Sequence, residues 1–180
     1  PFLENTVAKY LAIKKALYIT SHEKINGNYL EFGVFTGSSF NYAIKTNKKI
    51  EKLFGKTDCE FIGFDSFKGF GNVKEEDVHP GFTDQIFSVD ERKVIKNINK
   101  IAKGQKFRLI KGFYQDTIKN KTTLDLNITN KSRVVMIDCD LKESTKLALE
   151  FIKPSLQEGT ILIFDDFLDY KGSMVKGECG

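Results

Sequence analysis

Carboxylates at two points of the chain are the residues best placed to do chemistry. Asp138 and Asp140 flank a cysteine at the end of the apolar run RVVMI, and Asp165 and Asp166 directly follow the run ILIF. Crowded carboxylates repel one another unless a cation joins them. Hard oxygen ligands suit Mg²⁺, so one interpretation is a magnesium site among these acids. The other is a set of solvated acids at the polar edge of a sheet.

A further acid lies beside a glycine-rich turn in the stretch LEFGVFTGSS. Glu31 stands inside an apolar run, and Gly33 and Gly37 follow it in the pattern E-x-G-x-x-x-G. Glycines allow a tight turn and a close approach of the backbone to a ligand. The pattern matches neither the dinucleotide fingerprint nor the P-loop. Glu31 would repel a phosphate and attract a cationic group, or it simply caps the turn.

Two more strand ends carry polar residues. Asp65 closes the run CEFIGFD, where an acid can accept hydrogen bonds from the hydroxyls of a ribose or cap a turn. Gln115 and Asp116 follow Gly112 after the run KFRLIKG. Either of them can read the edge of an adenine, and Asp116 can instead cap a short helix.

Short apolar runs alternate with longer helical patterns and would position these residues. The runs predict strands over residues 28–34, 59–65, 106–112, 133–139 and 160–166. The helical spacing of apolar residues predicts helices over 4–20, 38–54, 90–103, 115–120 and 143–157. Strands that are apolar on both faces and separated by helices indicate an α/β fold with a doubly wound, Rossmann-like, mainly parallel sheet and helices on both faces. Ligands of such folds bind at the carboxyl ends of the strands, where these polar residues stand.

Bulk properties narrow the class of protein. A chain of 180 residues fits a single domain, residues 1–180. Its net charge is +4, but the basic residues are dispersed and no basic-aromatic module accompanies them, so we expect no nucleic-acid partner. The cysteines Cys59, Cys139 and Cys179 are far apart and odd in number, which favours free thiols. No apolar run is long enough to cross a membrane and the first residues do not form a signal peptide, so we expect a cytoplasmic protein.

Four stretches in order resemble the macrocin O-methyltransferase family. They are YLEFGVFTGSS, GFDSFKGF, GFYQDTI and MIDCDLKESTKLALEFIKPSLQEGTILIFDDF, and the resemblance covers about residues 28–170. The family comprises class I S-adenosylmethionine-dependent methyltransferases that act on sugar hydroxyls of natural products. The resemblance implies a Rossmann-like sheet, and we expect this chain to lack the last two strands of the class I methyltransferase sheet.

The resemblance implies a role for each polar strand end. It implies S-adenosylmethionine and Mg²⁺ as cofactors, and a small hydroxylated acceptor, in the first instance a sugar. The methionine part of the cofactor would lie at Glu31, Gly33, Gly37 and Ser39, the ribose at Asp65, and the adenine at Gln115 and Asp116. The three Mg²⁺ ligands would be Asp138, Asp165 and Asp166, with Asp138 thereby part of the catalytic group.

The chain departs from the family pattern beside the acids. Lys142 stands where an aromatic is usual, which leaves the acceptor open, and Leu141 stands where the related catechol enzymes carry a lysine base. Asp140, or His79 in the polar stretch KEEDVHPGFTDQ, can serve as the base instead. A solvated loop position is the alternative for His79.

Other classes of protein share part of these features. A DxD glycosyltransferase also places two acids after an apolar strand, and so does a haloacid-dehalogenase-type phosphatase, although the phosphatase motif comes early in the chain. Neither explains EFGVFTG or the adjacent Asp165 and Asp166. A degenerate methyltransferase fold that serves as a binding module is the non-enzymatic alternative, and a homo-oligomer is left open.

Overall fold

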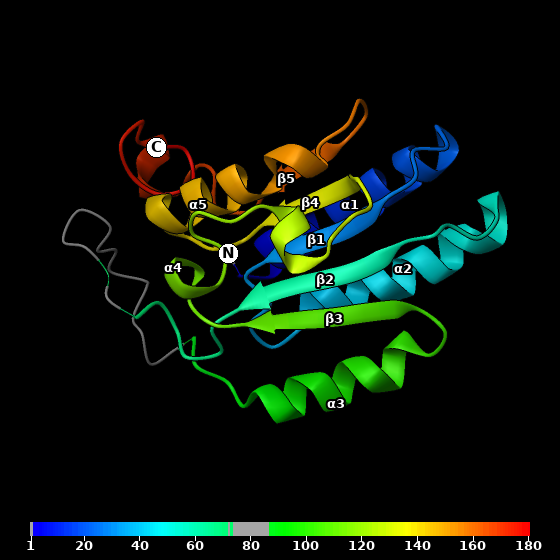
Figure 1. Ribbon diagram of the computed structural model, residues 1–180, viewed down its shortest axis with the longest axis horizontal. Helices are drawn as coiled ribbons and strands as arrows, with labels where there is room; N and C mark the ends of the chain where they lie inside the picture. The colour runs from blue at the N-terminus through cyan, green and yellow to red at the C-terminus, as the bar shows by residue number, and fades with distance from the viewer. Residues whose placement is uncertain (1, 72, 74–86) are drawn as a thin grey trace.

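The computed structural model describes residues 2–71, 73 and 87–180, with side chains from residue 4 onward. At its centre lies a five-stranded sheet with the strand order β3-β2-β1-β4-β5, in which every neighbouring pair runs parallel (Figure 1). The strands are β1 (Asn28–Phe32), β2 (Glu60–Asp65), β3 (Lys106–Lys111), β4 (Ser132–Ile137) and β5 (Ile161–Phe164). The main helices are α1 (Phe2–His22), α2 (Ser38–Phe54), α3 (Glu91–Ala102) and α5 (Lys142–Ile152). Short helical turns complete the described chain: α4 (Tyr114–Thr117), η2 (Thr123–Leu126), η3 (Lys153–Ser155) and α6 (Asp169–Gly172).

The sheet is apolar on both faces because each face is covered by helices. Side chains alternate along a strand, so Tyr29 faces one side and Leu30 the other. The Tyr29 face packs against α1, α2 and α3, whereas the Leu30 face packs against α4 and α5. Both cores are rich in aromatic rings, for example the stacked pair Phe32 and Phe64 on neighbouring strands. This double burial is the reason that the strands read as continuous apolar runs in the sequence.

The chain reverses its direction of travel across the sheet between β1 and β4. It passes from β1 outward to β2 and β3, and then returns to place β4 on the other side of β1 and β5 beyond it. The last paired residues of β1 and β4 are Phe32 and Ile137, so the loops that follow these strands diverge from adjacent points. This topological switch point is where open α/β sheets bind their ligands.

The predicted elements are confirmed, with shifts at their ends. The five predicted strands are present, and each is one to three residues shorter than predicted. The helix predicted over 38–54 is observed with the same bounds. The helix predicted over 143–157 ends at Ile152, and η3 continues it. α6 was not predicted, because its four residues are too few to show a periodic pattern.

The structure also shows the state of the cysteines and the character of the described helices. Cys59, Cys139 and Cys179 are free thiols, as predicted. Among the helices of the described chain, none is both long and apolar enough to cross a membrane.

Candidate active site

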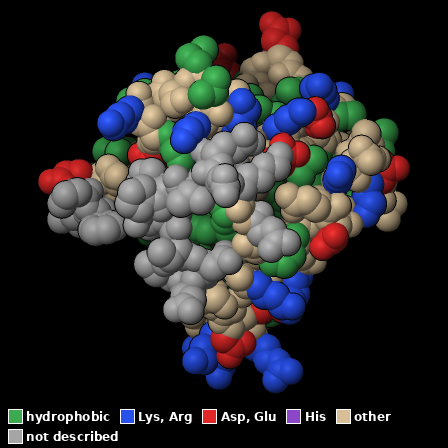
Figure 2. Space-filling view, turned by 90° about the vertical axis from the view of Figure 1, so that its left-hand side faces the viewer, with side chains coloured by type: hydrophobic (Ala, Val, Ile, Leu, Met, Phe, Trp, Pro, Cys, Tyr) green, Lys and Arg blue, Asp and Glu red, His purple; other side chains and the backbone are tan. Residues whose placement is uncertain are grey.

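A cavity of about 350 Å³ opens at the carboxyl ends of the strands, which is within the size range of small-molecule sites. Segments that follow all five strands line it, and the first half of α1 closes one side with Asn5, Thr6 and Lys9. Figure 2 looks onto this end of the molecule, where basic, acidic and apolar side chains are interspersed over the described surface.

The turn after β1 is built on a very close approach of two strand ends. Gly33 has a φ of 96°, and a Cβ atom there would lie 1.7 Å from the carbonyl oxygen of Asp138. The Asp138 amide donates to the carbonyl of Phe32 at 2.8 Å, which holds the ends of β1 and β4 together. Only glycine fits this position. Phe35 in the same turn also has a positive φ, of 48°, and it lines the cavity.

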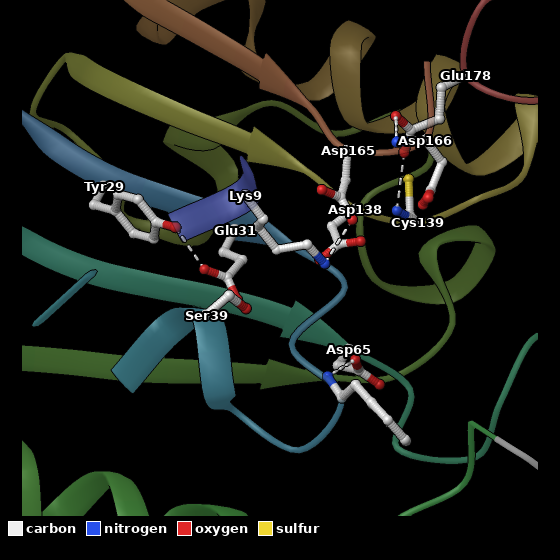
Figure 3. A network of polar contacts seen from close by, with 11 residues as sticks. Lys9, Tyr29, Glu31, Ser39, Asp65, Asp138, Cys139, Asp165, Asp166 and Glu178 are labelled. Atoms are coloured by element: carbon white, nitrogen blue, oxygen red, sulfur yellow. Dashed lines mark hydrogen bonds and ion pairs between the residues drawn. The ribbon is translucent and has the colours of Figure 1, made fainter. Parts of the chain in front are cut away.

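Glu31 lies beneath the cavity floor and is fully buried (Figure 3). The Tyr29 hydroxyl donates to Oε2 of Glu31 at 2.6 Å, and the Ser39 hydroxyl donates to Oε1 at 2.7 Å. Burial raises the pKa of Glu31 to about 7, although both hydrogen bonds and the charge of Lys9 oppose the shift. Ser39 lines the cavity whereas Glu31 does not, so the acid acts on the cavity through the hydroxyl that it orients.

Asp65 ends β2 and presents its carboxylate to the cavity. The amide of Phe35 donates to one oxygen and the amide of Phe67 to the other, each at 2.6 Å. Burial raises its pKa, while these backbone hydrogen bonds oppose the rise. The two amides fix the orientation of the carboxylate, and each oxygen keeps a lone pair for a ligand hydroxyl. Asp65 is thus a turn cap whose remaining acceptor capacity is available to the cavity.

The acids that follow β4 and β5 converge at the carboxyl edge of the sheet. Oxygen atoms of Asp138, Asp165 and Asp166 all lie within 4.8 Å of one another. β5 ends at Phe164, so the two adjacent aspartates stand in a turn, and side-chain alternation along a strand does not separate them. The Asp165 amide still donates to the Ile137 carbonyl at 3.0 Å, which ties this turn to the end of β4. Asp140, two residues after Asp138, has a φ of 62° and lines the same cavity.

Electrostatics in this cluster favours a bound cation. Burial raises the pKa values of Asp138 and Asp140 well above the usual range, and that of Asp166 to a smaller extent. The negative charges of neighbouring aspartates raise them further. A cation would lower these pKa values and offset the repulsion. The cluster offers hard oxygen donors in the spacing that a metal ion can bridge, so the residues present fit Mg²⁺.

Sequence reasoning missed two partners of the cluster. The Lys9 ammonium contacts Oδ2 of Asp138 and Oδ2 of Asp165, each at 2.6 Å. Glu178 accepts hydrogen bonds from the amides of Cys139 and Asp166, both at 3.2 Å, and burial raises its pKa to about 8. The sequence does hold a signal for Lys9, which precedes Ile13, Ala16 and Leu17 on the buried stripe of α1. No local pattern marks Glu178.

The remaining predicted residues are distributed unevenly around the cavity. Gln115 lines it, whereas Asp116 is exposed on α4 and Gly37 lies in the turn before α2 without reaching the cavity wall. Leu141 is buried, and the Lys142 ammonium donates to the carbonyl of Val175 at 3.3 Å. His79 lies outside the described residues.

Comparisons with known proteins identify the family of this chain. Residues 8–177 match the family model of the macrocin O-methyltransferases (TylF). Comparison with curated protein sequences gives no significant match.

Solved methyltransferase structures share the fold. The calicheamicin methyltransferase CalS11 superposes with a TM-score of 0.70 at 25% identity, covering 91% of this chain and 65% of the other. The O-methyltransferase NovP gives 0.69 at 23% identity, over 91% of this chain and 66% of the other. An apo structure of CalS11, described as a TDP-rhamnose 3'-O-methyltransferase of calicheamicin biosynthesis, gives 0.59 at 24% identity, over 91% and 64%. The chain thus spans about two thirds of the length of these relatives.

Proposed function

Because the chain belongs to the macrocin O-methyltransferase family, we propose that it transfers the methyl group of S-adenosylmethionine to a hydroxyl of a sugar or a similar acceptor with vicinal oxygens. The family match over residues 8–177 is the observation that carries this proposal. The likeness to CalS11, which is described as a calicheamicin methyltransferase and a TDP-rhamnose 3'-O-methyltransferase, supports the choice of a sugar.

The residues that line the cavity support S-adenosylmethionine as its ligand. Asp65 keeps acceptor capacity, which we assign to the ribose hydroxyls, and Gln115 lines the cavity and is our candidate contact for the adenine. Phe113 adds an apolar wall beside Gln115. The cofactor carries a sulfonium and an ammonium group, which a cavity lined by several acids attracts. Ser39, oriented by the buried Glu31, is our candidate contact for the methionine end.

We assign Asp138, Asp165 and Asp166 as the residues that would hold Mg²⁺. When bound, the ion would supply Lewis acidity that lowers the pKa of the acceptor hydroxyl. These three residues stand directly after β4 and β5. Their position at the switch point lies directly beside Gly33, and thus beside the proposed methionine end.

The reaction requires alignment and the removal of one proton. The bond between sulfur and methyl breaks, its electron pair stays on sulfur, and a bond forms between the methyl carbon and the acceptor oxygen. The acceptor hydroxyl gives up its proton to a base. Asp140 is our candidate for this base, since its carboxylate lines the cavity next to the acids that would hold Mg²⁺ and so can lie within reach of the acceptor hydroxyl. His79 is the alternative from the sequence.

Calorimetry and isotope transfer test the proposal together. S-adenosylmethionine should bind to the purified protein, and a labelled methyl group should pass to nucleotide-linked deoxysugars. If the protein bound no S-adenosylmethionine but bound a sugar nucleotide in a Mg²⁺-dependent way, a glycosyltransferase would replace this assignment. Binding of the cofactor without transfer to any hydroxylated acceptor would indicate a binding module.

A further inference from the structure

The ammonium group of Lys9 already sits on the proposed metal ligands. Its Nζ atom lies 2.6 Å from Oδ2 of Asp138 and 2.6 Å from Oδ2 of Asp165. Figure 3 shows the side chain reaching from α1 toward the two acids, which come from the ends of β4 and β5. One lysine therefore joins three elements that are far apart in the sequence.

The packing of α1 holds the backbone of Lys9 in place, whereas its side chain lies at the wall of the cavity. Ile13 and Leu17, one and two turns further along α1, are fully buried in the core. The ring of Tyr10 stacks on Tyr42 of α2 with a centroid separation of 4.4 Å. Lys9 itself is partly exposed and lines the cavity, and its four-carbon stem is flexible, so we expect the ammonium group to be able to turn away from the acids.

A metal ion bound to these acids and the Lys9 ammonium group in its present position would repel each other. Mg²⁺ binds oxygen at about 2.1 Å, so an ion on either Oδ2 atom would lie no more than about 4.7 Å from Nζ where Lys9 now stands. Two cations at that separation repel each other strongly in a partly buried site. A single positive charge, on the other hand, leaves three neighbouring carboxylates incompletely neutralised.

We propose that Lys9 is a resident cation that holds Asp138 and Asp165 together in the metal-free protein and is displaced when Mg²⁺ binds. This inference rests on the proposed function, in which these acids are the metal ligands. Exchange of the two cations makes metal binding weaker than three carboxylates alone would give, and it frees an ammonium group at the wall of the cavity. The freed group is then available to an acceptor that carries a negative charge, such as the diphosphate of a nucleotide-linked sugar.

The first test compares Mg²⁺ affinity by calorimetry in the wild-type protein and in Lys9→Met. Methionine keeps the length of the apolar stem and removes the charge. We expect at least tenfold tighter Mg²⁺ binding in the variant. The matched control is Lys15→Met, which removes a charge from an exposed position of the same helix and should leave the affinity within twofold. Equal affinity in Lys9→Met and wild type would overturn the exchange.

A second measurement needs no variant and covers the case in which Lys9→Met fails to fold. Reductive methylation of lysines, read by peptide mass spectrometry, should modify Lys9 slowly without metal and at least fivefold faster with saturating Mg²⁺, while the rate at Lys15 stays constant. Mg²⁺ binding with no change at Lys9 would overturn the exchange but leave the metal site standing. No Mg²⁺ binding in either protein would overturn both the metal site and the exchange, whereas S-adenosylmethionine binding, measured separately, would still decide the rest of the proposed function.

Discussion

Glu31 offers the sharpest test of the electrostatics beneath the cavity. Its carboxyl group is fully buried, and its pKa is raised from 4.5 to about 7. Below pH 4.5 it is protonated in both the folded and the unfolded chain. Between pH 4.5 and 7 the unfolded chain releases this proton and the folded protein retains it, so the free energy of unfolding falls as pH rises. A difference of about 2.5 pKa units corresponds to about 3 kcal/mol.

The substitution Glu31→Gln isolates this contribution because glutamine does not titrate. At pH 4.5 we expect the variant to be about 1 kcal/mol less stable, since its amide group must meet the hydroxyl of Tyr29 or Ser39 as a donor. By pH 7.5 it should be about 2 kcal/mol more stable, because the wild-type protein then holds a buried charge. Other acids of raised pKa titrate in both proteins and cancel in the comparison.

Urea unfolding followed by circular dichroism from pH 4.5 to 8 measures this difference. Glu150→Gln, the same substitution at an exposed position of α5, is the matched control. A constant difference for Glu31→Gln would refute the reasoning, since it would mean that Glu31 has an ordinary pKa in the folded protein.

Three further substitutions test the other parts of the site. Asp65→Ala should weaken S-adenosylmethionine binding by about 1–3 kcal/mol in calorimetry, since a hydrogen-bonding carboxylate is lost, and unchanged affinity would place the ribose elsewhere. Asp165→Asn should weaken Mg²⁺ binding at least tenfold while cofactor affinity stays within twofold; equal loss of both would show that Asp165 is not a metal ligand. Gly33→Ala should lower the free energy of unfolding by about 3 kcal/mol or more, because its Cβ would lie 1.7 Å from a backbone oxygen, and a variant of wild-type stability would contradict the close approach of β1 and β4.

The sequence was sufficient for the fold because local and global signals agree. Most strands are short, mainly apolar runs, each strand ends on an acid or directly before a glycine or an acid, and α2 lies between Gly37 and Gly55. The convergence of Asp138, Asp165 and Asp166 follows from the same topology, since parallel strands end at one edge.

The parts that were missed depend on contacts between distant segments. The ion pair of Lys9 with Asp138 joins residues 129 positions apart, and Glu178 reaches the cluster only because the chain after α6 folds back onto it. The position of Glu31 beneath the cavity was within reach of the sequence. Strand alternation places Glu31 on the same face as Tyr29, which is the buried face against α2.

A crystal structure of the protein with S-adenosylhomocysteine and Mg²⁺ tests the central claim most directly. We expect the ribose hydroxyls to lie within hydrogen-bonding distance of Asp65 and the adenine to lie beside Gln115. The metal ion should be bound by Asp138, Asp165 and Asp166. S-adenosylhomocysteine bound away from the carboxyl edge of the sheet, or a cavity that stays empty at saturating ligand, would contradict this claim.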